Sequence, residues 1–294
     1  MRKRMRAVLV GVIALLGVGL VAPTPAGAIT GGQETGPNLY PNVGVIFFYD
    51  DGVRYRCSAT LVTPTVLLTA AHCTYGVEGD TIVSFDHDIA RNPAERDANV
   101  PIASDPAAGY TAADLAGFEG WYTGEEFAHP EYSDFTDLDN WNDVGVVVFD
   151  EPFVGIEPAE VAPLNWLDQY AQPALNSTLF TVVGYGTEVR KPDSGPQKPT
   201  PQSYPLVRRY TDAVGQKLTD QILQVNGNEN DIRGGGGSCF GDSGGPTFDP
   251  AGYLVTVTSY GYTSNCRYID GLQRVDIDVV QNWLAAFGVY PAVA

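Results

Sequence analysis

The sequence predicts an all-β fold of barrel type that is followed by a C-terminal α-helix. Many short runs of apolar, aromatic and β-branched residues are separated by turn residues, which is the pattern of a barrel built from short strands. The clearest pair is residues 43–49 and 55–62, which flank the hairpin signal Asp51-Gly52. A clear helical pattern is found near the end of the chain, after Asp276.

Further strands are expected along the rest of the chain. They cover residues 65–69, 81–85, 144–149, 178–184, 254–260 and 271–275. The segment 88–128 is rich in Ala, Pro, Asp and Gly and has weak periodicity, so we expect a surface insertion, either at the rim of a cleft or inert. The final helix would be capped by Asp276 and would carry Val280 and Leu284 on one face, with Gly288 past its end.

The first 28 residues have the pattern of a secretory signal peptide. Basic residues open the chain, an apolar run covers residues 7–22, and Ala26-Gly27-Ala28 supplies a small-x-small cleavage site. The apolar run is short for a membrane span, and no later stretch is long and apolar enough to be one. We therefore expect a secreted, extracellular protein without a membrane anchor once the signal is removed.

The charge balance narrows the range of partners. The chain has a formal net charge of −18 at pH 7, and because the signal segment is basic, the exported part is more acidic still. An acidic surface argues against binding to nucleic acid and to anionic membranes. The simplest role of this charge is solubility outside the cell, and the alternative is attraction of cationic substrates.

The segment Gly241-Asp242-Ser243-Gly244-Gly245-Pro246 gives the strongest indication of chemistry. Glycines allow a tight turn on which the N–H groups beside Ser243 point at a developing oxyanion, and the serine then needs a base. The segment also fits the G-x-S-x-G motif of α/β-hydrolases, in which the histidine follows the serine. Here His72, His87 and His129 all precede Ser243, so the order excludes that family.

Together with Thr69-Ala70-Ala71-His72-Cys73, this segment resembles the chymotrypsin-like (trypsin-like) secreted serine proteases. The resemblance covers nearly all of the chain after the signal, and it implies two antiparallel β-barrels with the active site between them. Residues 29–155 would form the N-terminal barrel. Residues 156–294 would form the C-terminal barrel and the C-terminal helix, and the two barrels would make one peptidase domain.

The resemblance also bears on the four cysteines, all of which lie in the exported part and suggest disulfides. Four cysteines allow three pairings. We expect Cys57–Cys73, beside His72, and Cys239–Cys266, beside Ser243, and the resemblance implies the same pairs. No C-x-x-C pair occurs, so zinc is not expected.

His72, Asp143 and Ser243 are the expected catalytic residues. In this interpretation His72 is the base, Asp143 orients its imidazole, and Ser243 attacks the scissile carbonyl. Asp143 is preferred over the acidic residues before it because it begins a buried apolar strand. The N–H groups of Gly241 and Ser243 would form the oxyanion hole, and the chemistry requires neither a metal nor an organic cofactor.

The expected substrate-binding residues lie on either side of Ser243. The segment Ser259-Tyr260-Gly261 resembles the family strand that pairs with an extended peptide substrate. Trypsin-like members carry an Asp at the position of Gly237, which Ser238 follows, so an apolar P1 residue is favoured here. The alternative is that Asp270 enters the pocket from another side and serves a basic P1 residue.

The N-terminus after signal removal would be Ile29. By the resemblance, its ammonium folds inward and pairs with Asp242, so that signal removal itself would generate the active terminus. The leading hypothesis for function is a secreted serine endopeptidase that acts through an acyl-enzyme on protein or peptide substrates. The alternative is a catalytically silent homologue that acts as a binding module. We expect a monomer that protein inhibitors can bind.

Overall fold

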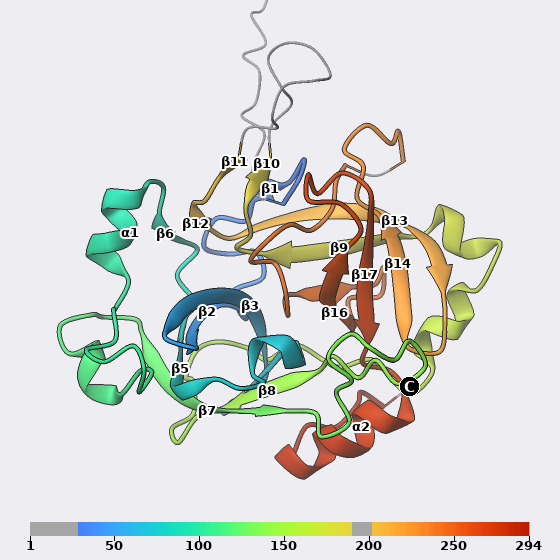
Figure 1. Ribbon diagram of the computed structural model, residues 1–294. Helices are drawn as coiled ribbons and strands as arrows, with labels where there is room; N and C mark the ends of the chain where they lie inside the picture. The colour runs from blue at the N-terminus through green and yellow to red at the C-terminus, as the bar shows by residue number, and fades with distance from the viewer. Residues whose placement is uncertain (1–28, 190–201, 234, 294) are drawn as a thin grey trace, which may run out of the picture.

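Two antiparallel β-barrels follow one another along the chain (Figure 1). The structure, a computed structural model, describes residues 29–189, 202–233 and 235–293, and the expected signal peptide lies outside these ranges. The all-β architecture with a short C-terminal helix confirms the fold predicted from the sequence. None of the helices in the described ranges is long and apolar enough to cross a membrane.

The first barrel is closed by six strands in the order β2-β3-β4-β8-β7-β5. Their bounds are β2 (Val43–Asp50), β3 (Val53–Thr63), β4 (Val66–Thr69), β5 (Glu78–Ser84), β7 (Tyr122–Ala128) and β8 (Gly145–Val148). Successive side chains of a strand point to opposite faces. In β2, Val45 and Phe47 accordingly join one apolar cluster, whereas Ile46 and Phe48 join another.

The second barrel has the strand order β13-β14-β17-β16-β15-β9, and pairing of β13 with β9 closes it. Its strands are β9 (Leu179–Gly184), β13 (Arg209–Leu218), β14 (Ile222–Asn226), β15 (Pro246–Phe248), β16 (Leu254–Gly261) and β17 (Ile269–Arg274). The short β1 (Gln33–Glu34) pairs with β13. Ile29 is fully buried in the core of this barrel, so the segment after the signal lies on the second barrel although it comes first in sequence.

Small elements connect and cover the barrels. The two α-helices are α1 (Pro93–Asn99) and α2 (Asp278–Leu284). The short strands are β6 (Asp88–Ala90), β10 (Glu188–Val189), β11 (Gln202–Ser203) and β12 (Leu206–Val207). The 3-10 turns are η1 (Ala71–Cys73), η2 (Ala112–Leu115), η3 (Trp166–Tyr170), η4 (Ala174–Ser177) and η5 (Ala285–Phe287).

Two local expectations differ from the structure. The insertion expected over residues 88–128 ends earlier, because Tyr122–Ala128 forms the barrel strand β7. Asp276 does not cap the last helix, whose N-cap is Ile277. Instead, the Asp276 carboxylate accepts hydrogen bonds from the Leu167 N–H at 2.7 Å and from the Arg274 guanidinium at 2.9 Å. The Asp276 side chain is therefore used by partners outside the helix, and it does not cap the helix as the local sequence had predicted.

Arg208 fixes the two barrels against each other. Its side chain is 1% exposed and donates hydrogen bonds to the carbonyl oxygens of Val43 and Phe85, both at 3.0 Å, in the first barrel. It also donates to Thr35 Oγ1 at 3.1 Å, in the segment that lies on the second barrel. A buried guanidinium with these acceptors is satisfied without a carboxylate partner. This contact sets the spacing of the barrels between which the candidate site lies.

Candidate active site

His72 and Asp143 meet through two hydrogen bonds. His72 lies on η1, directly after β4, and Asp143 lies just before β8, which pairs with β4. The His72 N–H donates to Asp143 Oδ1 at 2.9 Å, and the ring nitrogen Nδ1 lies 2.9 Å from Oδ2. Since a carboxylate only accepts, Nδ1 carries the hydrogen and Nε2 is left as an acceptor. The pairing thus selects the tautomer that a general base requires.

The environment of this pair favours a charged imidazole. The Asp143 side chain is fully buried, while the His72 side chain keeps 22% of its surface exposed. Burial by itself lowers the pKa of His72, but the charge of Asp143 and its hydrogen bond outweigh that effect, so the pKa of His72 is raised. The arrangement can therefore hold a proton that His72 takes from a neighbouring hydroxyl.

A serine and a tryptophan that the sequence did not assign to this role support Asp143. Ser259 Oγ lies 2.6 Å from Asp143 Oδ2 and donates to it. The Trp141 indole N–H in turn donates to Ser259 Oγ at 2.9 Å. Because Ser259 already accepts this bond, its single hydroxyl proton is directed at Asp143. Gln273 also holds the segment, because its Oε1 accepts from the Asp143 N–H at 3.1 Å.

Aromatic rings line the approach to His72. The ring centroids of His72 and Phe135 are 5.5 Å apart, and Phe135 packs edge-on against Trp141 at 5.2 Å. Trp141 lies 5.2 Å from Tyr260, which continues the wall on β16. Phe135 lies between Asp134 and Asp137 in the sequence, so no local apolar pattern indicated this contact. The wall is apolar along one side of the site and partly exposed at Phe135.

The turn that carries Ser243 is attached to the first barrel. Ser58 Oγ donates to Gly241 O at 2.9 Å, and the Ser58 N–H donates to Ser243 O at 2.8 Å. A Cβ at Gly244 would collide with Thr69 Oγ1 and with the Ala70 nitrogen, so the absence of a side chain there allows the close approach. This contact brings Ser243 next to the strand end that delivers His72.

Two backbone N–H groups beside Ser243 are free. Gly241 has φ of +94°, a conformation that favours glycine. Within the ranges that the structure describes, the N–H groups of Gly241 and Ser243 donate to no acceptor. Buried or half-buried N–H groups are usually paired. Unpaired donors at this turn are what an oxyanion site needs before substrate arrives.

A pocket of about 300 Å³ opens beside Ser243. Its lining includes the expected substrate-binding residues Ser238, Ser259, Tyr260, Gly261 and Asp270. Gly237 itself does not line the pocket, and a Cβ there would collide with both Asp270 Oδ2 and the Gly227 Cα. None of residues 88–128 lines it, which separates the insertion from the pocket.

Asp270 is the one acidic residue on this lining. It is 2% exposed, and its Oδ2 accepts from the Ser238 N–H at 2.6 Å. Within the described residues it forms no ion pair. Burial raises the pKa of Asp270 to about 7, and the hydrogen bonds from Ser238 offset only part of this effect. The pocket therefore holds a carboxyl group that lacks a cation partner.

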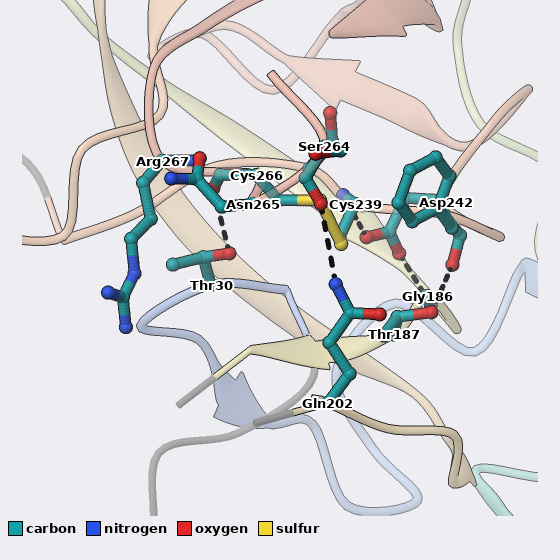
Figure 2. The surroundings of a disulfide bond; sticks show 12 residues. Thr30, Gly186, Thr187, Gln202, Cys239, Asp242, Ser264, Asn265, Cys266 and Arg267 are labelled. Atoms are coloured by element: carbon teal, nitrogen blue, oxygen red, sulfur yellow. Dashed lines mark hydrogen bonds between the residues drawn. A yellow bond between two sulfur atoms is a disulfide. The ribbon is translucent and has the colours of Figure 1, made fainter. Parts of the chain in front are cut away.

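The wall of this pocket is fixed by a disulfide and by the segment after Ile29 (Figure 2). Cys239 is bonded to Cys266, and Thr30 Oγ1 donates to Cys266 O at 3.0 Å. The Thr30 and Gly237 backbones exchange two hydrogen bonds of 3.0 and 3.2 Å. A second disulfide joins Cys57 to Cys73, which follows His72. The segment that carries Ser243 and the segment that carries His72 are thus each anchored by a disulfide.

Asp242 is buried beneath the same turn. Its carboxylate accepts from the Cys239 N–H at 2.9 Å and from the Gly186 N–H at 2.7 Å (Figure 2). Burial raises the pKa of Asp242 to about 7, although these bonds and the charge of Arg56 oppose the shift. In this chain the Ile29 nitrogen is still in a peptide bond with Ala28, so the expected ion pair between Ile29 and Asp242 stays a prediction.

Other candidate ligands have structural roles. His129 Nδ1 accepts from the Glu131 N–H at 3.2 Å, Nε2 lies 3.3 Å from Val279 O, and burial lowers the pKa of the ring. Among the described residues, the one group with metal-ligand spacing is Cys57, His72 and Cys73. The two sulfurs in that group are bonded to each other and cannot act as thiolate ligands.

Comparison with known proteins agrees with the fold and the motifs. The family model for trypsin matches residues 29–284. Brachyurin from Leptuca pugilator is 28% identical over 254 residues, which cover 84% of this chain and 93% of brachyurin. Spermosin from Halocynthia roretzi is 25% identical over 252 residues, which cover 80% of this chain and 56% of spermosin.

Solved structures share the architecture at low identity. The structure of HL collagenase has a TM-score of 0.60 and 17% identity, covering 87% of this chain and 97% of that one. Human heparin binding protein has a TM-score of 0.57 and 15% identity, covering 90% of this chain and all of the other. At this identity the likeness concerns the fold alone.

Proposed function

Because the chain belongs to the trypsin family of serine proteases, we propose that it is a secreted endopeptidase that uses Ser243, His72 and Asp143. The observation that carries this proposal is the pair of 2.9 Å contacts between His72 and the buried Asp143. A silent binding module is not favoured, since no member of this set is missing and the pair has the geometry of a base with its orienter.

In the proposed reaction Ser243 Oγ attacks the carbonyl carbon of the scissile peptide while His72 Nε2 takes its proton. The tetrahedral oxyanion accepts hydrogen bonds from the N–H groups of Gly241 and Ser243. His72 then gives the proton to the leaving amine, and an acyl-enzyme on Ser243 remains. Water, deprotonated by the same ring, releases the acid and restores the hydroxyl.

Asp143 keeps the imidazole in one tautomer and stabilises the imidazolium that forms during each half-reaction. It remains ionised throughout. The Ser259 hydroxyl, itself held by the Trp141 indole N–H, would hold Asp143 Oδ2 in place. This bond would keep the carboxylate from rotating away from His72. Ser259 therefore acts through Asp143, in addition to lining the pocket.

For the P1 residue we propose two substrate classes. The aromatic wall at Tyr260 suits an apolar side chain, which was the preference drawn from the sequence, although Gly237 does not line the pocket. The buried Asp270 suits a basic side chain, because an unpaired carboxylate in a pocket attracts a cation. We propose that Arg and Lys are accepted when Asp270 is ionised, and that apolar residues are accepted in either state.

The test of the proposed function is hydrolysis of an unfolded protein by the secreted chain. The Ser243→Ala variant should lose activity by a factor of about 10⁴ or more. Ser177→Ala, at an exposed serine outside the pocket, is the matched control and should stay within about twofold of the unmodified protein. Equal activity of the Ser243→Ala variant would contradict the proposal.

A further inference from the structure

A second hollow, larger than the pocket beside Ser243, lies away from Ser243. It has a volume of about 930 Å³ and shares no lining residue with the pocket beside Ser243. One wall comes from the end of β5 and the loop after β8, which includes residues 149–154. The other wall comes from the insertion, through the end of α1 and residues 112–121. In Figure 1 the insertion lies beside the first barrel, on the side away from the second barrel.

Aromatic side chains form the floor of this groove. The half-buried Phe153 lies at their centre, within 5 Å of the ring centroids of Phe85, Tyr122 and Phe149. Each of these contacts is edge-on, so the four rings form one packed cluster. Tyr122 is 47% exposed and Val154 is 91% exposed, which leaves apolar surface open to solvent.

The rim of the groove is acidic and has no positive charge of its own. Five carboxylates line it, and none of the described lining residues is Lys, Arg or His. Asp86 and Asp88 already have neighbours outside the lining, because they contact His87 and Arg91. Glu119, Asp150 and Glu151 are exposed and form no ion pair within the described ranges. Exposed apolar surface at Tyr122 and Val154, in the same lining as unpaired carboxylates, suits a cation with an apolar neighbour.

We propose that this groove docks a cationic polypeptide segment in which Lys or Arg residues alternate with aromatic residues. The basic side chains would face Glu119, Asp150 and Glu151, and an aromatic side chain would pack on Phe153 and Tyr122. Docking uses none of the residues around Ser243, so it does not depend on the proposed protease activity. On a protease, the docked segment would belong to a protein substrate that is held at a distance from the pocket beside Ser243.

The direct test is binding of a fluorescent twelve-residue peptide of alternating Lys and Phe to the full secreted chain carrying Ser243→Ala. Fluorescence anisotropy at low and at physiological salt gives the dissociation constant. The triple variant Glu119→Gln, Asp150→Asn and Glu151→Gln should weaken binding about tenfold or more at low salt. A peptide of alternating Lys and Ser, with the same charge, should also bind several-fold more weakly because it lacks the aromatic contact.

Matched controls separate the groove from the general acidity of the chain. The triple variant Asp51→Asn, Asp105→Asn and Asp220→Asn removes three exposed carboxylates elsewhere and should change the dissociation constant less than about twofold. Protein that keeps Ser243 and carries a covalent phosphonate on it should bind the peptide as the Ser243→Ala chain does. Equal effects of the two triple variants, equal binding of the two peptides, loss of binding in the phosphonate-labelled protein, or no binding at all would each overturn the proposal.

Discussion

The carboxylate of Asp270 lies in the space that a Cβ on Gly237 would need. A side chain at position 237 would therefore collide with the buried carboxylate of Asp270, and also with the backbone of Gly227. The carboxyl group of the pocket is that of Asp270, which lies on β17. It accepts a hydrogen bond from the Ser238 N–H in the segment leading to Ser243. The absence of an acidic residue at position 237 in the sequence consequently does not mean that the pocket is neutral.

Replacing Asp270 tests which side chains the pocket selects. We expect Asp270→Asn to lower kcat/KM for Arg and Lys peptides by about 10- to 100-fold, the value of a hydrogen bond to a charged group. Peptides with Leu or Phe at P1 should change by less than about threefold, because the amide keeps the volume of the carboxyl. A chromogenic peptide series that differs only at P1 measures both. An equal loss on both classes would indicate a folding effect instead of a selective one.

The pH dependence of selectivity follows from the same residue. Burial raises the pKa of Asp270 to about 7, above its ordinary value, so the group is neutral below that pH and charged above it. The ratio of kcat/KM for Arg peptides to that for Leu peptides should therefore rise between pH 5.5 and 8.5. Taking the ratio cancels the titration of His72, which acts on both substrates. A ratio that stays flat, or one that also rises in Asp270→Asn, would be inconsistent with this assignment.

Ser259 and Trp141 should act on catalysis through Asp143. Ser259→Ala removes the 2.6 Å hydrogen bond to Asp143, and we expect kcat to fall about tenfold or more with the pH profile of the base displaced. Trp141→Phe removes only the donor to Ser259, so its loss should be smaller. Steady-state kinetics across pH measures both variants. A larger effect of Trp141→Phe than of Ser259→Ala would contradict the order of this network.

The N-terminus should control activity through Asp242. We expect protein that begins at Ile29 to exceed a form that retains two extra residues before Ile29 by about tenfold or more in kcat/KM. The free ammonium would pair with the buried Asp242, whose pKa is otherwise raised to about 7, whereas an extended chain offers only an amide. The same two residues added at the C-terminus serve as the control. Equal activity of both N-terminal forms would contradict a role of the ion pair between Ile29 and Asp242 in activity.

Much of the fold could be predicted from the sequence. The predictions held where the local residue pattern matches the burial that the segment has in the folded protein. The run that became β2 and the buried strand β8 after Asp143 are examples. The strand β7 was missed because its sequence contains Gly124, Glu125 and Glu126. A Cβ at Gly124 would come within 2.8 Å of Val147 and Val148, so close packing explains the glycine. Desolvation raises the pKa of the half-buried Glu126 to about 7. A polar surface segment and this strand have the same local pattern.

The candidate site was predictable where motifs specify it and not where distant residues meet. Motifs indicated His72 and Ser243, and context selected Asp143. The contact of Trp141 with Ser259 joins residues 118 positions apart, and no spacing rule indicates it. Asp270 could be suspected from the sequence, but its position depends on the register of β17 against β14 and β16.

Covalent labelling is the most direct test of the central claim, that Ser243 is a nucleophile activated by His72. Secreted protein is incubated with a peptidyl phosphonate ester, and the adduct is located by mass spectrometry of peptides. We expect one adduct, on Ser243, that His72→Ala reduces by a factor of about 10³ or more while the fold, followed by circular dichroism, is kept. Protein that begins at Ile29 but gains no adduct, or an adduct on another residue that forms equally in His72→Ala, would contradict the account.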